Sequence, residues 1–158
     1  GMFYKRRDYS TVVNGKNPIV AHEFLGDSVE GKDVIIIDDM ISSGGSMLDT
    51  AKQLKAMKAR RVYICCTFGL FTDGLKNFDV AYEHGDFDKV ITTNLTYLPP
   101  EIYTRPYFVE ADMSKFIASL IDFMNHDASL SNVMATTEKI HGILAAYNKR
   151  TEMSAFHF

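Results

Sequence analysis

Apolar residues fall into short runs and helical stripes that alternate along most of the chain. The run Val34–Ile37 is continuous and β-branched, which is typical of a strand buried on both faces of a parallel sheet. Apolar residues then recur every three or four positions at Met47, Ala51 and Leu54, and this spacing predicts an amphipathic helix. Residues 61–67 predict a second buried strand.

The alternation of strands and helices continues toward the end of the chain. The further elements that we predict are strands over residues 19–25, 87–92 and 107–109, a helical or irregular segment over 73–83, and helices over 114–125 and 137–148. The polar residues 8–18, with their Asn-Gly and Asn-Pro turn signals, predict a mobile loop. This order predicts an α/β fold, a three-layer sandwich with a mainly parallel sheet.

Length and charge exclude several classes of protein. The 158 residues favour a single domain over 1–158, and the net charge of −3 argues against a general binder of nucleic acid. Since no apolar run approaches the ~20 residues that span a bilayer, and no signal segment opens the chain, we expect a cytoplasmic protein without a membrane partner. The adjacent Cys65 and Cys66 are expected to stay reduced.

One segment carries candidate chemistry, because two acids and a loop of small residues stand between the first buried strand and its helix. Asp38 and Asp39 close the strand, and the loop consists of Ser42, Ser43, Gly44, Gly45 and Ser46. Glycines let a backbone approach a ligand closely, and the amino end of a helix offers unpaired N–H groups and a positive dipole. A phosphate fits such a place, although an ordinary strand–turn–helix connection with a serine cap has the same residue types.

The two adjacent aspartates need a partner that neutralises their charge. Hydroxyl groups, a divalent cation or an amine would do so. A phosphate beside acids therefore suggests a phosphorylated polyol such as a sugar phosphate. The loop is not a Walker A sequence, because no Gly-Lys-Ser/Thr follows it.

The ordered motifs resemble the ribose-phosphate pyrophosphokinase (PRPP synthetase) family, in particular its carboxy-terminal half. The matching blocks are Lys5-Arg6-Arg7, Val29-Glu30-Gly31-Lys32, Asp38-Asp39-Met40-Ile41 with the loop after it, Cys65-Cys66-Thr67, and Thr93-Asn94. The resemblance covers roughly residues 2–125, and residues 126–158 form an unmatched helical tail. It implies a phosphoribosyltransferase-like fold and, since the amino-terminal half is missing, a chain that does not turn over alone.

The resemblance also implies a reaction and roles for the motif residues. ATP and ribose 5-phosphate would give AMP and PRPP, with Mg²⁺ as cofactor, in a complete enzyme that assembles as a homo-oligomer, a dimer or a hexamer. Residues 42–46 would hold the 5-phosphate, while Asp38 and Asp39 would face the ribose hydroxyls and the magnesium ion bound to them. Lys5 and Arg7 would be catalytic and close over the diphosphoryl group that ATP transfers.

Two departures from the family pattern keep other functions open. Ser42 stands where the loop usually has an acid, and Phe68 stands where many members have a histidine. One alternative is a phosphoribosyltransferase that uses PRPP as its donor. Another is a non-catalytic, PRPP-synthetase-like regulatory subunit.

Overall fold

The computed structural model describes the backbone of residues 1–7 and 19–155 and the side chains of residues 1–3, 24–131 and 133–149. The predicted loop over residues 8–18 lies outside this part. The chain divides into two compact units, Gly1–Ala111 and Asp112–Phe158. The single domain over 1–158 with a helical tail from residue 126 stays a prediction.

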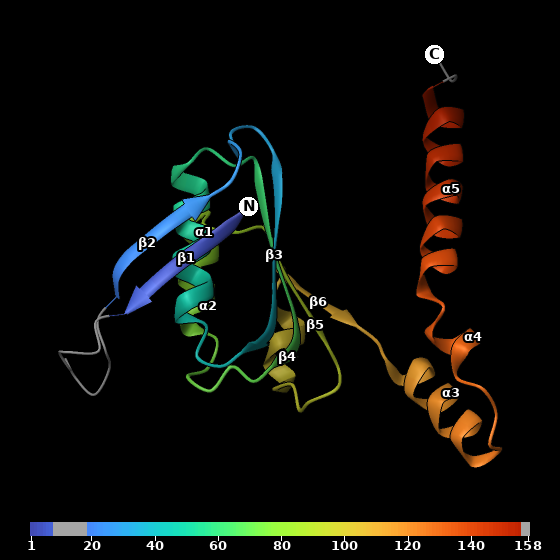
Figure 1. Ribbon diagram of the computed structural model, residues 1–158. Helices are drawn as coiled ribbons and strands as arrows, with labels where there is room; N and C mark the ends of the chain where they lie inside the picture. The colour runs from blue at the N-terminus through green and yellow to red at the C-terminus, as the bar shows by residue number, and fades with distance from the viewer. Residues whose placement is uncertain (8–18, 156–158) are drawn as a thin grey trace. The chain divides into compact units, whose positions relative to one another are not determined.

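The first unit contains the sheet and the helices between its strands (Figure 1). The strands β3 (Asp33–Ile41), β4 (Arg61–Gly69), β5 (Lys89–Thr93) and β6 (Phe108–Ala111) are parallel and lie side by side in this order. Their connections are α1 (Gly45–Ala56), α2 (Lys76–His84) and the 3₁₀ helix η1 (Pro100–Thr104). The predicted α/β fold with a parallel sheet flanked by helices is confirmed.

An antiparallel hairpin precedes this sheet. Its strands are β1 (Met2–Arg7) and β2 (Ile19–Leu25), and the backbone of Lys5 pairs with that of His22. The predicted strand over residues 19–25 is thereby confirmed. Phe3 and Phe24 contact each other with ring centroids 5.1 Å apart, and both pack against the main core.

The second unit is helical. It consists of α3 (Ser114–Asn125), α4 (Ser131–Met134) and α5 (Thr136–Ala155). The helix predicted over residues 114–125 agrees with α3, and α5 extends beyond the predicted 137–148. None of the helices in the described part of the chain combines the length and the apolar character needed to cross a membrane.

The core lies between the sheet and the helices α1 and α2, which occupy the same side of the sheet in Figure 1. Val62, Ile64 and Val90 point into it and are fully buried. The opposite side chains of β3 are exposed, Ile35 by 60% and Ile37 by 81%. The prediction that the run over residues 34–37 is buried on both faces was therefore wrong, because α1 and α2 pack on one face only.

Paired charges hold the beginnings of β3 and β4 together. Asp33 accepts hydrogen bonds from Arg60 Nε at 2.8 Å and from Arg61 Nη2 at 2.6 Å. The two guanidinium groups hold the pKa of this carboxyl well below its usual range. The backbone pairing that starts at Asp33 and Arg61 continues to Ile41 and Gly69, so these charges mark the register of the whole strand pair.

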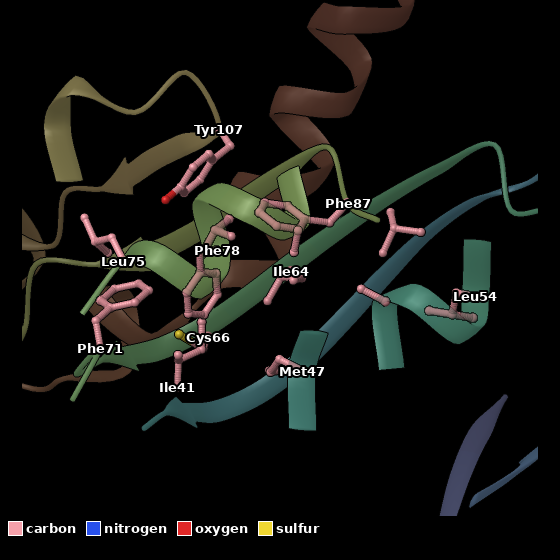
Figure 2. Packing of buried hydrophobic residues seen from close by; sticks show 14 of the residues in the cluster. Ile41, Met47, Leu54, Ile64, Cys66, Phe71, Leu75, Phe78, Phe87 and Tyr107 are labelled. Atoms are coloured by element: carbon pink, nitrogen blue, oxygen red, sulfur yellow. The ribbon is translucent and has the colours of Figure 1, made fainter. Parts of the chain in front are cut away.

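A buried aromatic cluster fills the space between α2 and the sheet (Figure 2). Phe78, Phe87 and Tyr107 are at most 2% exposed, and their rings meet edge to face. The Tyr107 hydroxyl donates to Asp79 Oδ1 at 2.7 Å, and Arg105 Nε donates to the same carboxylate at 2.9 Å. The Arg105 guanidinium is the main cause of a lowered pKa at Asp79.

We predict that Tyr107→Phe lowers the free energy of unfolding by about 1.5 kcal/mol, because it removes a buried hydrogen bond to a charged acceptor. Urea denaturation of the full chain measures this change. The matched control is Tyr103→Phe, since Tyr103 also bonds a carboxylate, that of Glu110, but is 56% exposed. We expect the control to change stability by less than about 0.5 kcal/mol. Equal losses in the two variants would contradict the role assigned to Tyr107.

Candidate functional site

The loop over residues 42–46 connects β3 with α1, as the sequence predicts. Ile41, 1% exposed, anchors its beginning, and Met47, 5% exposed, anchors its end. The backbone N–H of Leu70 donates to the carbonyl of Ile41 at 2.8 Å, and that of Thr72 donates to the carbonyl of Ser42 at 3.1 Å. The loop is therefore braced by the end of the neighbouring strand β4 and the residues that follow it.

Gly44 and Gly45 have different reasons to be glycine. Gly44 is the residue before α1 and has φ = 86°, in the left-handed region that favours glycine. A Cβ on Gly44 would lie 2.3 Å from Cζ of Phe78, whereas a Cβ on Gly45 would have no atom within 4 Å. One side of the loop thus packs on the core, and the other side leaves room for a ligand.

The open side of the loop borders a cavity of about 180 Å³. The residues that line the cavity are Asp38, Met40, Ile41, Ser42, Ser43, Gly44, Gly45, Ser46 and Met47. The loop leads into the amino end of α1, where the helix dipole is positive. No acidic side chain stands in the first turn of α1.

The two aspartates lie near the carboxyl end of β3, which continues past them to Ile41. Asp38 lines the cavity and also accepts a hydrogen bond from the backbone N–H of Asp39 at 2.9 Å. Consecutive side chains of a strand point to opposite faces, so the two carboxylates do not converge on one point. Asp39 is exposed and is not among the residues that line the cavity.

Asp38 and Asp39 do not belong to a larger cluster of metal-ligating side chains. Among the side chains that the structure describes, no group of three or more histidine, cysteine or acidic residues could hold a metal ion. Magnesium usually binds one or two carboxylates together with water and substrate phosphates. Asp38, which lines the cavity, is a carboxylate of this kind.

Lys5 and Arg7 lie on β1, and the backbone of Arg7 pairs with that of Ile19. Their side chains lie outside the described residues, so their catalytic role stays a prediction. Cys66 pairs in register with Asp38, and burial raises the pKa of its thiol to about 11. Cys65 and Cys66 are both free thiols, as expected from the sequence.

Sequence reasoning named Met40 and Phe68 but missed Phe78, the aromatic residue that packs against the loop. Met40 lines the cavity, Phe78 lies against Gly44, and Phe68 is paired in register with Met40 and 39% exposed. A Phe in a predicted helix carries no local signal that it supports a loop more than thirty residues earlier. Only the pairing of β3 with β4 and the position of α2 bring these residues together.

Comparisons with known proteins agree with the resemblance. The profile of the phosphoribosyl synthetase-associated domain family matches residues 9–135. A ribose-phosphate pyrophosphokinase of Corynebacterium efficiens is 46% identical over 94 residues, which cover 52% of this chain and 28% of that protein. A ribose-phosphate pyrophosphokinase of Nostoc is 33% identical over 109 residues, which cover 69% of this chain and 32% of that protein.

A solved structure supports the fold. The crystal structure of phosphoribosylpyrophosphate synthetase from Mycobacterium smegmatis matches with a TM-score of 0.56 at 23% sequence identity, over 72% of this chain and 35% of that one. This chain thus spans about a third of the length of the proteins it matches. Together with the family profile, which covers most of the sequence, these findings show that the chain belongs to the phosphoribosyl synthetase-associated domain family.

Proposed function

We propose that this chain is the part of a ribose-phosphate diphosphokinase that binds ribose 5-phosphate and PRPP, and that it does not turn over alone. The observation that carries the proposal is the loop over residues 42–46. It combines an open backbone surface at Gly45 with the positive end of α1 and with a carboxylate, Asp38, in the same cavity. Family membership supports the same ligand.

In this proposal the loop holds the 5-phosphate of the sugar. Backbone N–H groups at the start of α1 and the hydroxyl groups of Ser42, Ser43 and Ser46 donate to the phosphate oxygens. A phosphate is a compact dianion, so several donors can reach it within a cavity of about 180 Å³. The sugar ring then extends toward the end of β3.

Asp38 and Asp39 act on the ribose. Their carboxylates would accept hydrogen bonds from the ribose hydroxyls, and either would supply a ligand to a magnesium ion that the substrate carries. Magnesium supplies charge neutralisation for the phosphoryl groups when it is bound. The residues of this chain orient the sugar so that its anomeric hydroxyl is directed at the incoming nucleotide.

The reaction transfers a diphosphoryl group. The anomeric oxygen forms a bond to the β-phosphorus of ATP, the bond from that phosphorus to the bridging oxygen of the α-phosphate breaks, and AMP leaves. The proton of the anomeric hydroxyl is released to solvent. Lys5 and Arg7 close over the transferred group and neutralise the charge that develops on its oxygens.

Two residues favour the non-catalytic alternative, a regulatory subunit. Ser42 leaves the loop without the acid usual in the family, and Phe68, 39% exposed, stands beside Met40 at the end of the strands. A serine hydroxyl still donates to phosphate, so a regulatory subunit of this kind would bind the sugar phosphate but would not catalyse the transfer. Turnover of the complete protein, assembled with its remaining polypeptide as a dimer or hexamer, separates the two functions.

We predict that Asp39→Ala abolishes the binding of ribose 5-phosphate in the presence of magnesium, because it removes a carboxylate that holds the sugar and its metal ion. Titration calorimetry of the full chain measures the affinity. Asp27→Ala is the control, since Asp27 is an exposed acid outside the loop, and it should leave the affinity unchanged. Unchanged affinity in Asp39→Ala would overturn the assignment of the site.

We predict that Lys5→Ala slows turnover of the complete enzyme by about a hundredfold or more and spares the affinity for ribose 5-phosphate, because its interaction belongs to the transition state. Steady-state kinetics give both quantities. Lys52→Ala, which removes an exposed lysine outside the matching blocks, should leave turnover unchanged. A large loss of affinity with normal turnover would contradict the catalytic role.

A further inference from the structure

The backbone of Gly44, in the middle of the loop over residues 42–46, lies against a core side chain. A Cβ on Gly44 would lie 2.3 Å from Cζ and 2.4 Å from Cε2 of Phe78, which is closer than real Cβ atoms approach. The backbone of Gly44 therefore lies directly on the edge of the Phe78 ring. No comparable neighbour lies within 4 Å of the Cβ position of Gly45, on the ligand side of the loop.

The Phe78 ring is itself held firmly. Phe78 belongs to α2, and its side chain is fully buried. Its ring centroid is 5.2 Å from that of Phe71 and 6.3 Å from that of Phe87, and both pairs of rings meet edge to face. Figure 2 shows the ring of Phe78 between these two neighbours, with Ile41 and Cys66 nearby. The loop is supported by a part of the core that has little room to shift.

The remaining supports of the loop act at its two ends. Ile41 and Met47 are buried anchors, and backbone hydrogen bonds from Leu70 and Thr72 fix the carbonyls of Ile41 and Ser42. Gly44 is buried in the middle, where the chain turns through φ = 86° into α1. The distance between this turn and the core sets the direction of the N–H groups that follow it.

We propose that Phe78 is the positioning residue of the phosphate loop. Its ring edge sets how deeply Gly44 sits and so aims the N–H groups at the start of α1 toward the ligand. This inference rests on the proposed function for its ligand, ribose 5-phosphate. Phe78 does not touch the ligand, since it lies on the side of Gly44 that faces the core.

The first test compares Phe78→Leu with Phe87→Leu in the full chain. Both variants trim a buried aromatic residue of one cluster, so we expect similar losses of melting temperature. Phe78→Leu should weaken the binding of ribose 5-phosphate about tenfold, because a small displacement of the donors is costly. Phe87→Leu, which has no contact with the loop glycine, should change the affinity less than twofold. Equal effects of the two variants on affinity would overturn the inference.

The second test uses rescue. Gly44→Ala adds a methyl group that collides with the Phe78 ring and also strains the positive φ, so it should weaken binding strongly. Adding Phe78→Leu makes room for the methyl group, so the double variant should bind more tightly than Gly44→Ala alone. Losses that simply add would contradict a direct contact between the two residues.

A third measurement separates this inference from the proposed function. In the unliganded wild-type chain, nuclear Overhauser effects should connect the Gly44 Hα protons with the ring protons of Phe78, and Phe78→Leu should shift the amide resonances of Gly44, Gly45 and Ser46. Phe78→Leu that leaves these resonances in place would overturn the positioning role. A wild-type chain that shows the contact but does not bind ribose 5-phosphate would contradict the proposed function alone.

Discussion

The parallel pairing of β3 with β4 determines where the functional groups of this chain lie. The pairing begins at Asp33 and Arg61, where two arginines share one carboxylate, and it runs to Ile41 and Gly69. A slip of one residue would move Asp38 to the other face of the sheet and out of the cavity. The same register brings Leu70 and Thr72 to the loop carbonyls, so β4 both continues the sheet and braces the site. The loop, its support from α2 and the carboxylate all follow from this one strand pair.

The close approach of the loop backbone to the core is the second constraint. Gly44 occupies a position where φ is positive and where a side chain would enter the Phe78 ring. Gly45 does not have a positive φ, and a Cβ on it would meet no neighbouring atom. The absence of a side chain at Gly45 leaves the cavity open. Two adjacent glycines therefore serve opposite sides of the same loop, one toward the core and one toward the ligand.

The sequence was sufficient for β3, the loop and α1, because each depends on local signals, whereas β1, η1 and α4 were not predicted. A β-branched run, a cluster of small residues and a stripe with helical spacing identify β3, the loop and α1 without any tertiary information. The end of β3 was misplaced because Asp38 and Asp39 are poor strand formers, and cross-strand pairing overrides this preference. The exposure of Ile35 and Ile37 was missed because a continuous apolar run does not reveal how many faces are covered. Phe78 could not be predicted, since its contact with Gly44 joins α2 to a loop far from it in the sequence.

In the proposed function, the loop between β3 and α1 binds the phosphate of ribose 5-phosphate. The most direct measurement is a ¹H–¹⁵N NMR titration of the full chain with ribose 5-phosphate in the presence of magnesium. We expect saturable shifts that are largest at the amides of Gly44, Gly45 and Ser46 and extend to Asp38. Shifts that never saturate, or that cluster at the amino ends of β4 and β5 instead, would contradict it.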